Sequence, residues 1–221
     1  MNDILEAVEL ETAPNPTTSV IWLHGLGADG HDFPPLVETL NLGPAPIRFV
    51  FPHAPKRPVT INGGYVMRAW YDILSPEFGG REDEEGLRGS QQLVENLIAR
   101  EEERGSPAER TVLAGFSQGG AIALQTGLRH PKRLAGLLVL SAYLPISHTL
   151  SGEASEENHG LPILMAHGTH DPIVPIDHAR QSSEMLGKLG YGVEWREYPM
   201  HHSVSPQEVD DIGAWFKRVL D

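Results

Sequence analysis

The chain has 221 residues, of which 40% are hydrophobic, and a formal net charge of −13. This acidic balance, without any basic run, argues against a nucleic-acid partner and against adsorption to anionic membranes. The absence of cysteine excludes disulfides, thiolate catalysis and cysteine-ligated metals. The first residues are acidic without the apolar core of a signal peptide, and no stretch has the roughly 18 apolar residues of a membrane span. We therefore expect a soluble cytoplasmic protein without stable membrane insertion.

Apolar runs predict the first elements of the chain. Residues 18–24 and 47–51 have the continuous apolar character of buried strands. Residues 93–98 then place apolar side chains on one face of a helix, which the Gly-Ser-Pro sequence at 105–107 ends. The alternation continues with strands predicted at residues 112–115, 134–140, 161–167 and 193–198, and helices at 121–125, 179–189 and after 205.

The last helix has the clearest start signal. Ser205 and Glu208 occupy the two positions of a capping box. The core face predicted after it consists of Val209, Ile212, Phe216 and Val219. Strands that alternate with helices are typical of an α/β fold with a mostly parallel central sheet and helices on both faces. We expect one such domain over residues 1–221.

One segment, residues 54–86, interrupts this alternation. It has no helical period and contains several prolines, but its apolar cluster at 65–72 argues against disorder. Irregular segments of this length are often lids over a functional site. We therefore predict a flap-like insertion with residues 81–85 as its solvated end. An extra hairpin packed on the core is the alternative, and the two can both hold.

A serine motif lies between a predicted strand and a predicted helix. Residues 115–119 read Gly-Phe-Ser-Gln-Gly, so Ser117 sits on a sharp turn flanked by glycines. This arrangement is the nucleophile elbow of α/β-hydrolases, which exposes the serine hydroxyl above the sheet edge. A glycine-rich turn whose serine only caps the next helix is the alternative.

A serine nucleophile needs a histidine base and a carboxylate, which follow it in this chain order in the fold. Asp171 follows the strand at 161–167, where a catalytic acid is expected, whereas Asp177 is placed to begin the next helix. His201 and His202 are adjacent, and local sequence does not choose between them as the base. An H-x-x-H pair, His167 and His170, lies on a strand end, where we expect core or supporting histidines and no metal.

Two N–H groups must stabilise the oxyanion of the reaction. We expect the residue after the nucleophile, Gln118, to supply one, and the loop at 24–27 to supply the other through Leu26. A plain glycine-rich turn is the alternative for that loop. Residues 25–30 also match Gly-x-Gly-x-x-Gly, the pattern of an NAD(P)-dependent oxidoreductase. That interpretation lacks the acidic residue expected at the end of the second strand. Arg48, which could hint at a 2′-phosphate, lies inside that strand. A catalytically inactive hydrolase fold used for binding is a third alternative, against which the complete Ser, Asp and His set argues.

The chain resembles the small bacterial carboxylesterases of the phospholipase/carboxylesterase family, relatives of the acyl-protein thioesterases. The resemblance spans nearly the whole length and rests on the segments at 20–30, 57–64, 70–72, 114–120, 167–171, 197–200 and 211–215. In this family pattern the catalytic histidine follows one variable position after Pro-Met, which selects His202.

The resemblance implies a serine carboxylesterase with Ser117, His202 and Asp171 as its triad and Leu26 and Gln118 as its oxyanion hole. It implies small to medium carboxylic esters as substrates, with thioesters or lysophospholipids as alternatives, no cofactor or metal, and a homodimer as one assembly. In the flap we predict substrate contacts from Met67, Arg68, Trp70 and Tyr71. Arg68 departs from the proline common in relatives; it favours a negative substrate group or pairs with Asp72 or Glu77.

Overall fold

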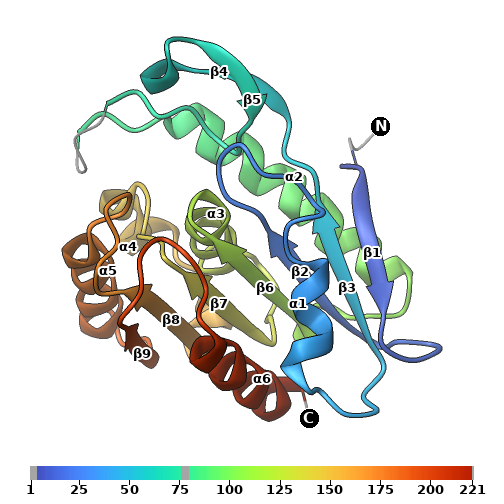
Figure 1. Cartoon of the computed structure of the whole chain (residues 1–221). Helices are drawn as coiled ribbons and strands as arrows, with labels where there is room; N and C mark the ends of the chain where they lie inside the picture. The colour runs from blue at the N-terminus through green and yellow to red at the C-terminus, as the bar shows by residue number, and fades with distance from the viewer. Residues whose placement is uncertain (1–3, 76–79, 221) are drawn as a thin grey trace.

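The computed structural model describes residues 4–75 and 80–220, so Glu77 lies outside the described residues. Within them, a seven-stranded sheet has the order β1-β3-β2-β6-β7-β8-β9, and β4 and β5 form a separate hairpin (Figure 1). The strands are β1 (Ala7–Glu11), β2 (Thr18–Leu23), β3 (Ile47–Pro52), β4 (Lys56–Val59), β5 (Tyr65–Arg68), β6 (Thr111–Phe116), β7 (Gly136–Leu140), β8 (Ile163–Gly168) and β9 (Val193–Tyr198).

Helices connect the strands. They are α1 (Pro34–Val37), α2 (Glu84–Glu103), α3 (Gln118–Gly127), α4 (Leu150–Glu153), α5 (Ile176–Lys188) and α6 (Pro206–Leu220). Short 3-10 turns are η1 (Glu38–Leu40), η2 (Thr60–Asn62), η3 (Ala108–Arg110), η4 (Ser147–Thr149) and η5 (Glu156–Asn158). No helix within the described ranges is long and apolar enough to cross a lipid bilayer.

The main sheet is parallel except at one edge, where β1 pairs antiparallel with β3. Alternate residues of its strands face two separate cores, as a period of two requires. In β2, Ile21 and Leu23 contribute to the core shared with α2, α3 and α5. Val20 and Trp22 contribute to the core on the opposite face, shared with α1 and α6. The predicted α/β fold with a mostly parallel sheet and helices on both faces is therefore confirmed.

The predicted strands and long helices are all present. Most boundaries shift by a few residues, but α2 begins at Glu84, well before its predicted face at residues 93–98. The capping box forms as expected, because Ser205 N–H donates to Glu208 Oε2 and Glu208 N–H donates to Ser205 Oγ, each at 3.2 Å. The sequence analysis missed β1. Its Ala-Val-Glu-Leu-Glu sequence is only partly buried because it lies at the sheet edge, so it lacks the continuous apolar run of the inner strands.

The segment expected to be a flap contains the β4–β5 hairpin, which projects from the rest of the molecule (Figure 1). Residues 81–85 were expected to form its solvated end; Arg81, Glu84 and Glu85 are exposed, but the run also contains the start of α2. Asp83 caps α2 by accepting the N–H of Gly86 at 3.0 Å, and Glu84 and Glu85 form the first turn of this helix. Acidic side chains at a helix N-terminus complement its dipole, which explains this charged run.

Candidate active site

The nucleophile elbow is built by backbone packing at the carboxyl end of β6. Ser117 has φ 56° and ψ −122°, a strained conformation for a residue with a side chain. A Cβ on Gly115 would lie 2.2 Å from the backbone of Gly119, and one on Gly119 would lie 2.2 Å from the carbonyl oxygen of Leu23. The flanking glycines are therefore required by close backbone contacts, and the positive φ falls on the serine itself. Helix α3, which follows, is buried along its whole length.

An aspartate and a histidine meet across the loops that follow β8 and β9. His202 Nδ1 lies 2.6 Å from Asp171 Oδ2, and both carboxylate oxygens are buried with their side chain. Asp171 Oδ1 accepts the N–H groups of Ile173 and Val174 at 2.8 and 2.9 Å. These bonds fix the carboxylate, which in turn orients the imidazole. The ring of His202 packs on that of Phe116, with 4.6 Å between centroids, beside the nucleophile.

The competing residues have other partners. His201 is exposed and its Nδ1 lies 2.9 Å from the carbonyl oxygen of His170. Asp177 lies in the first turn of α5 and pairs with Arg180 at 3.0 Å. Of the two neighbouring histidines, His202 is thus the one that contacts Asp171.

His167 supports the same carboxylate from inside the fold. It is fully buried, and its Nε2 lies 2.8 Å from the carbonyl oxygen of Val174 and 3.4 Å from Asp171 Oδ2. Burial lowers the pKa of His167, so the ring is neutral and donates its Nε2 proton to that carbonyl. His170 is exposed and its Nδ1 lies 3.4 Å from the hydroxyl of Thr169, whereas His167 is fully buried, so we do not interpret the H-x-x-H pair as one ligand set.

The oxyanion-loop candidates adjoin the elbow. A Cβ on Gly25 would lie 3.4 Å from Cβ of Ser117, which places the loop after β2 directly against the nucleophile. The neighbouring His24 is buried and neutral, since burial lowers its pKa to about 4. Its Nδ1 contacts the carbonyl oxygen of Gly25 at 2.7 Å and its Nε2 accepts the N–H of Ala54 at 3.0 Å. The loop is therefore held by side-chain hydrogen bonds beside Ser117.

The dinucleotide-binding interpretation of residues 25–30 is wrong. In such a motif the glycines open a helix whose N-terminus binds a pyrophosphate. Here the glycines are followed by turns, and the next helix is the short α1, which begins only at Pro34. The N–H of Gly27 is already used, since it donates to the carbonyl oxygen of Arg68 at 2.9 Å.

A cavity of about 360 Å³ opens at the elbow. Ser117, Gln118, Leu26 and Tyr71 line it, which brings four of the predicted site residues together. The apolar part of the remaining lining includes Ile61, Ile73, Leu74, Tyr143, Ile173 and Val174, and the charged part consists of Asp72, Arg81, Glu82 and Asp83. The sequence analysis did not select Tyr143, Ile173 or Val174. The signal for the last two was their position directly after Asp171.

The other predicted substrate contacts, Met67, Arg68 and Trp70, are not among the residues that line this cavity. Trp70 is fully buried and its Nε1 donates to the carbonyl oxygen of His24 at 2.8 Å. Met67 lies beside Gly27, with 3.7 Å between its sulfur and the position of a Cβ on that glycine. Arg68 donates to the carbonyl oxygen of Ala54 at 2.8 Å.

The pairing of Arg68 with Asp72 is not observed. The carboxylate of Asp72 instead accepts the N–H of Thr60 at 2.7 Å and its hydroxyl at 2.5 Å.

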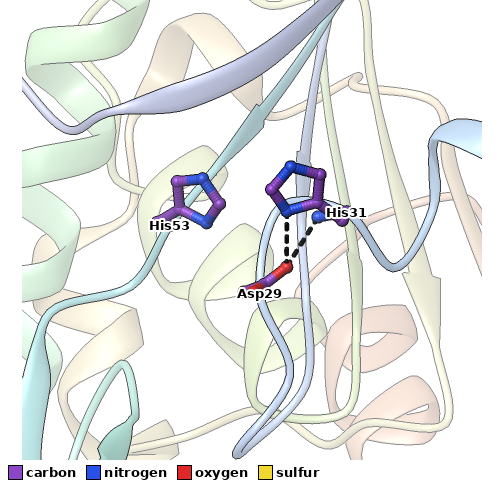
Figure 2. Close-up of side chains that lie close together, drawn as sticks. All are labelled: Asp29, His31 and His53. Carbon is purple, nitrogen blue, oxygen red and sulfur yellow. Dashed lines mark hydrogen bonds and ion pairs between the residues drawn. The ribbon is translucent and has the colours of Figure 1, made fainter.

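A group of possible metal ligands is formed by the loop after β2 together with the residue that follows β3. Figure 2 shows Asp29, His31 and His53, whose ligand atoms lie within 4.8 Å of one another. His31 Nδ1 already pairs with Asp29 at 3.0 Å, and His53 Nδ1 accepts the N–H of the buried Gly30 at 3.0 Å. An ion on either nitrogen of His53 would remove that acceptor, because the neutral ring has only one lone pair. Leaving a buried N–H unpaired costs roughly 1–3 kcal/mol. We interpret this group as a set of hydrogen bonds that holds the loop after β2 in place.

Known proteins resemble this chain along nearly its whole length. The chain is 40% identical to acyl-protein thioesterase 1 of Gibberella zeae, covering 94% of this chain and 93% of that protein. It is 35% identical to acyl-protein thioesterase 1 of Cryptococcus neoformans, with 92% and 93% covered. The crystal structure of Arabidopsis thaliana SOBER1 superposes with a TM-score of 0.87 at 35% identity, covering 92% of this chain and 99% of that chain.

These similarities confirm the α/β-hydrolase fold and correct one detail of the sequence-based resemblance. The curated relatives at 35–40% identity are fungal acyl-protein thioesterases, so the expected likeness to bacterial carboxylesterases in particular is not supported. The model of the phospholipase/carboxylesterase family matches residues 5–220. The chain is therefore a serine hydrolase that belongs to the phospholipase/carboxylesterase family.

Proposed function

We propose that this protein hydrolyses acyl thioesters, with S-acylated cysteine in a peptide or protein as its preferred substrate. The observation that carries the proposal is the strained Ser117 at a cavity with many apolar lining residues, beside the hydrogen-bonded pair of Asp171 and His202. Hydrolysis of carboxylic esters by the same residues is the second candidate. The names of the relatives at 35–40% identity favour the thioester.

In the proposed reaction, Ser117 Oγ attacks the acyl carbon while His202 takes its proton. The tetrahedral oxyanion is stabilised by the backbone N–H groups of Leu26 and Gln118. The carbon–sulfur bond then breaks, and His202 returns the proton to the departing sulfur. Water, deprotonated by His202, cleaves the acyl-enzyme to release the carboxylic acid and free Ser117. Asp171 holds the imidazole with its Nε2 lone pair available toward the serine.

The lining of the cavity supports an acyl chain as the group bound beside Ser117. Leu26, Ile73, Leu74 and Ile173 are aliphatic, and burial of one methylene contributes about 0.8 kcal/mol. Burial raises the pKa of the Tyr71 hydroxyl well above its ordinary range, so this side chain is uncharged and compatible with an apolar ligand. These features favour medium acyl chains over acetyl groups.

A pair of matched peptides tests the preference. The same short peptide carries an octanoyl group on cysteine sulfur in one version and on serine oxygen in the other. We expect a higher kcat/KM for the thioester, measured by release of octanoic acid, and loss of both activities in Ser117→Ala. A higher kcat/KM for the oxygen ester would support the carboxylesterase instead. Hydrolysis of neither peptide would reject an acyl-peptide substrate.

A further inference from the structure

The side chain of Gln118 makes two hydrogen bonds that the proposed reaction does not use. Its Oε1 accepts the N–H of Trp70 at 3.1 Å, and its Nε2 donates to the carbonyl oxygen of Tyr71 at 3.0 Å. Gln118 is only 4% exposed, so water does not compete for these bonds. A single carboxamide on α3 thereby joins the residue after the nucleophile to the chain that follows β5.

The joined segment is one wall of the cavity. Tyr71 and the three residues after it all contribute to the lining. The backbone at residues 70–71 belongs to no helix or strand, so side chains must hold it in place. Besides Gln118, Ser90 of α2 donates its hydroxyl to the carbonyl oxygen of Trp70, and the indole of Trp70 donates to His24.

We propose that the Gln118 carboxamide is a positioning group that sets the acyl-chain selectivity of the site. Gln118 directly follows Ser117 in the chain, so its carboxamide holds the Tyr71 wall at a fixed place relative to Ser117. This role belongs to the side chain and is separate from the backbone N–H of Gln118 in the oxyanion hole. The inference rests on the proposed hydrolysis of acyl thioesters, since it assigns the cavity to the acyl group.

Chain length separates this role from catalysis at the reacting carbon. An acetyl group ends beside Ser117, whereas the distal carbons of an octanoyl group reach the wall formed by Tyr71, Ile73 and Leu74. A displaced wall therefore lowers kcat/KM for the octanoyl substrate more than for the acetyl substrate. The ratio of their kcat/KM values isolates the effect, because losses at the oxyanion or the base are common to both.

The test compares Gln118→Met with Gln125→Met. Gln125 lies on the same helix, is fully buried and donates to Gln91, but it is not among the residues that line the cavity. We expect the octanoyl-to-acetyl ratio of kcat/KM on thioesters of one peptide to fall about 10-fold in Gln118→Met, because two buried hydrogen bonds are lost. In Gln125→Met the ratio should stay unchanged.

A conservative variant adds a readout that a merely structural role would not change. In Gln118→Glu the carboxylate keeps an acceptor for Trp70 but loses the donor to Tyr71. Protonation restores that donor, so the ratio should recover as the pH falls, in this variant alone. Protonation of the catalytic base lowers kcat/KM for both substrates equally, so this effect cancels in the ratio.

The outcomes are distinct. A wild-type protein that hydrolyses neither thioester contradicts the proposed function itself. Wild-type activity with an unchanged ratio in both Gln118→Met and Gln118→Glu overturns the positioning role and leaves the proposed function standing. If Gln118→Met does not fold, a pH-independent ratio in Gln118→Glu that equals the wild-type ratio has the same meaning.

Discussion

The two sides of the active site are held in place by different kinds of interaction. On the nucleophile side, Ser117 is fixed by backbone packing, in which Gly119 presses against the carbonyl oxygen of Leu23 and α3 is wholly buried. On the acid–base side, Asp171 and His202 lie in loops and are fixed by hydrogen bonds to side chains and to loop N–H groups.

The difference indicates what each side is sensitive to. Backbone packing does not titrate, so the elbow responds to added volume and hardly to pH. The loops depend on hydrogen bonds of ionisable side chains. Helix α6 follows these loops, and the carboxyl of Glu208 in its first turn is buried. Substitutions on the first side should act through sterics, and those on the second side through charge and hydrogen bonding.

Removal of the nucleophile should have the largest effect. In Ser117→Ala we expect kcat on a medium-chain thioester to fall roughly 10⁴-fold or more, because the covalent route is lost. The measurement is single-substrate kinetics, with thermal unfolding as a control for folding. Turnover close to that of the wild type would exclude Ser117 as the nucleophile.

Asp171→Asn should come next. An asparagine cannot hold His202 in the tautomer that accepts the serine proton, so kcat should fall about 10³- to 10⁴-fold. Asp177→Asn is the matched control, since Asp177 is an exposed aspartate six positions later that pairs with Arg180. Equal losses in the two variants would contradict the assignment of Asp171.

A methyl group tests the steric character of the nucleophile side. In Gly119→Ala the new Cβ would lie 2.2 Å from the carbonyl oxygen of Leu23 and 2.7 Å from that of His24, and both are backbone atoms. We expect a loss of about 3 kcal/mol in the free energy of unfolding, measured by urea titration. Gly152→Ala, where no atom lies within 4 Å, should change it by less than about 0.5 kcal/mol. Similar values for both variants would contradict the steric character of the nucleophile side.

The smallest effect concerns pH on the acid–base side. Burial raises the pKa of Glu208 from 4.5 to about 7. A raised folded-state pKa contributes stability that is complete below pH 4.5 and is lost as the pH rises through 7. Glu208→Gln lacks this loss, so its stability relative to the wild type should improve by at most about 3 kcal/mol from pH 4.5 to pH 8. The titration of His24 is common to both proteins and cancels.

Urea titrations at several pH values give this difference directly. A stability difference between Glu208→Gln and the wild type that does not change with pH would show that Glu208 keeps its ordinary pKa in the fold. The charge-based account of the acid–base side would then be wrong at this residue.

Much of the fold could be predicted because local sequence determines it. The buried strands are continuous apolar runs, and the Ser205–Glu208 capping box needs only two side chains at a fixed spacing. The elbow was predictable from its local pattern, a serine between glycines at a strand-to-helix turn, although Gly119 is required by a contact with the distant Leu23 carbonyl oxygen. Edge strand β1 was missed because partial burial leaves it without an apolar run.

The acid–base side was harder to predict because its contacts join distant parts of the chain. Local logic did not choose between His201 and His202; the family resemblance did, and the structure places His202 on Asp171. The start of α2 at Glu84 was misassigned because a charged run resembles solvated loop when its helix dipole is not considered. The cavity wall depends on the Gln118 carboxamide, whose partners lie 47 and 48 residues earlier.

Labelling by a fluorophosphonate tests most directly whether Ser117 and His202 act together. The reagent reacts with a serine only when a base activates it, and peptide mass spectrometry identifies the labelled residue. We predict stoichiometric labelling of Ser117 at similar rates in the wild type and in His201→Ala, and labelling about 10³-fold slower in His202→Ala. Rapid labelling of Ser117 in His202→Ala, or labelling at another residue in the wild type, would contradict the account.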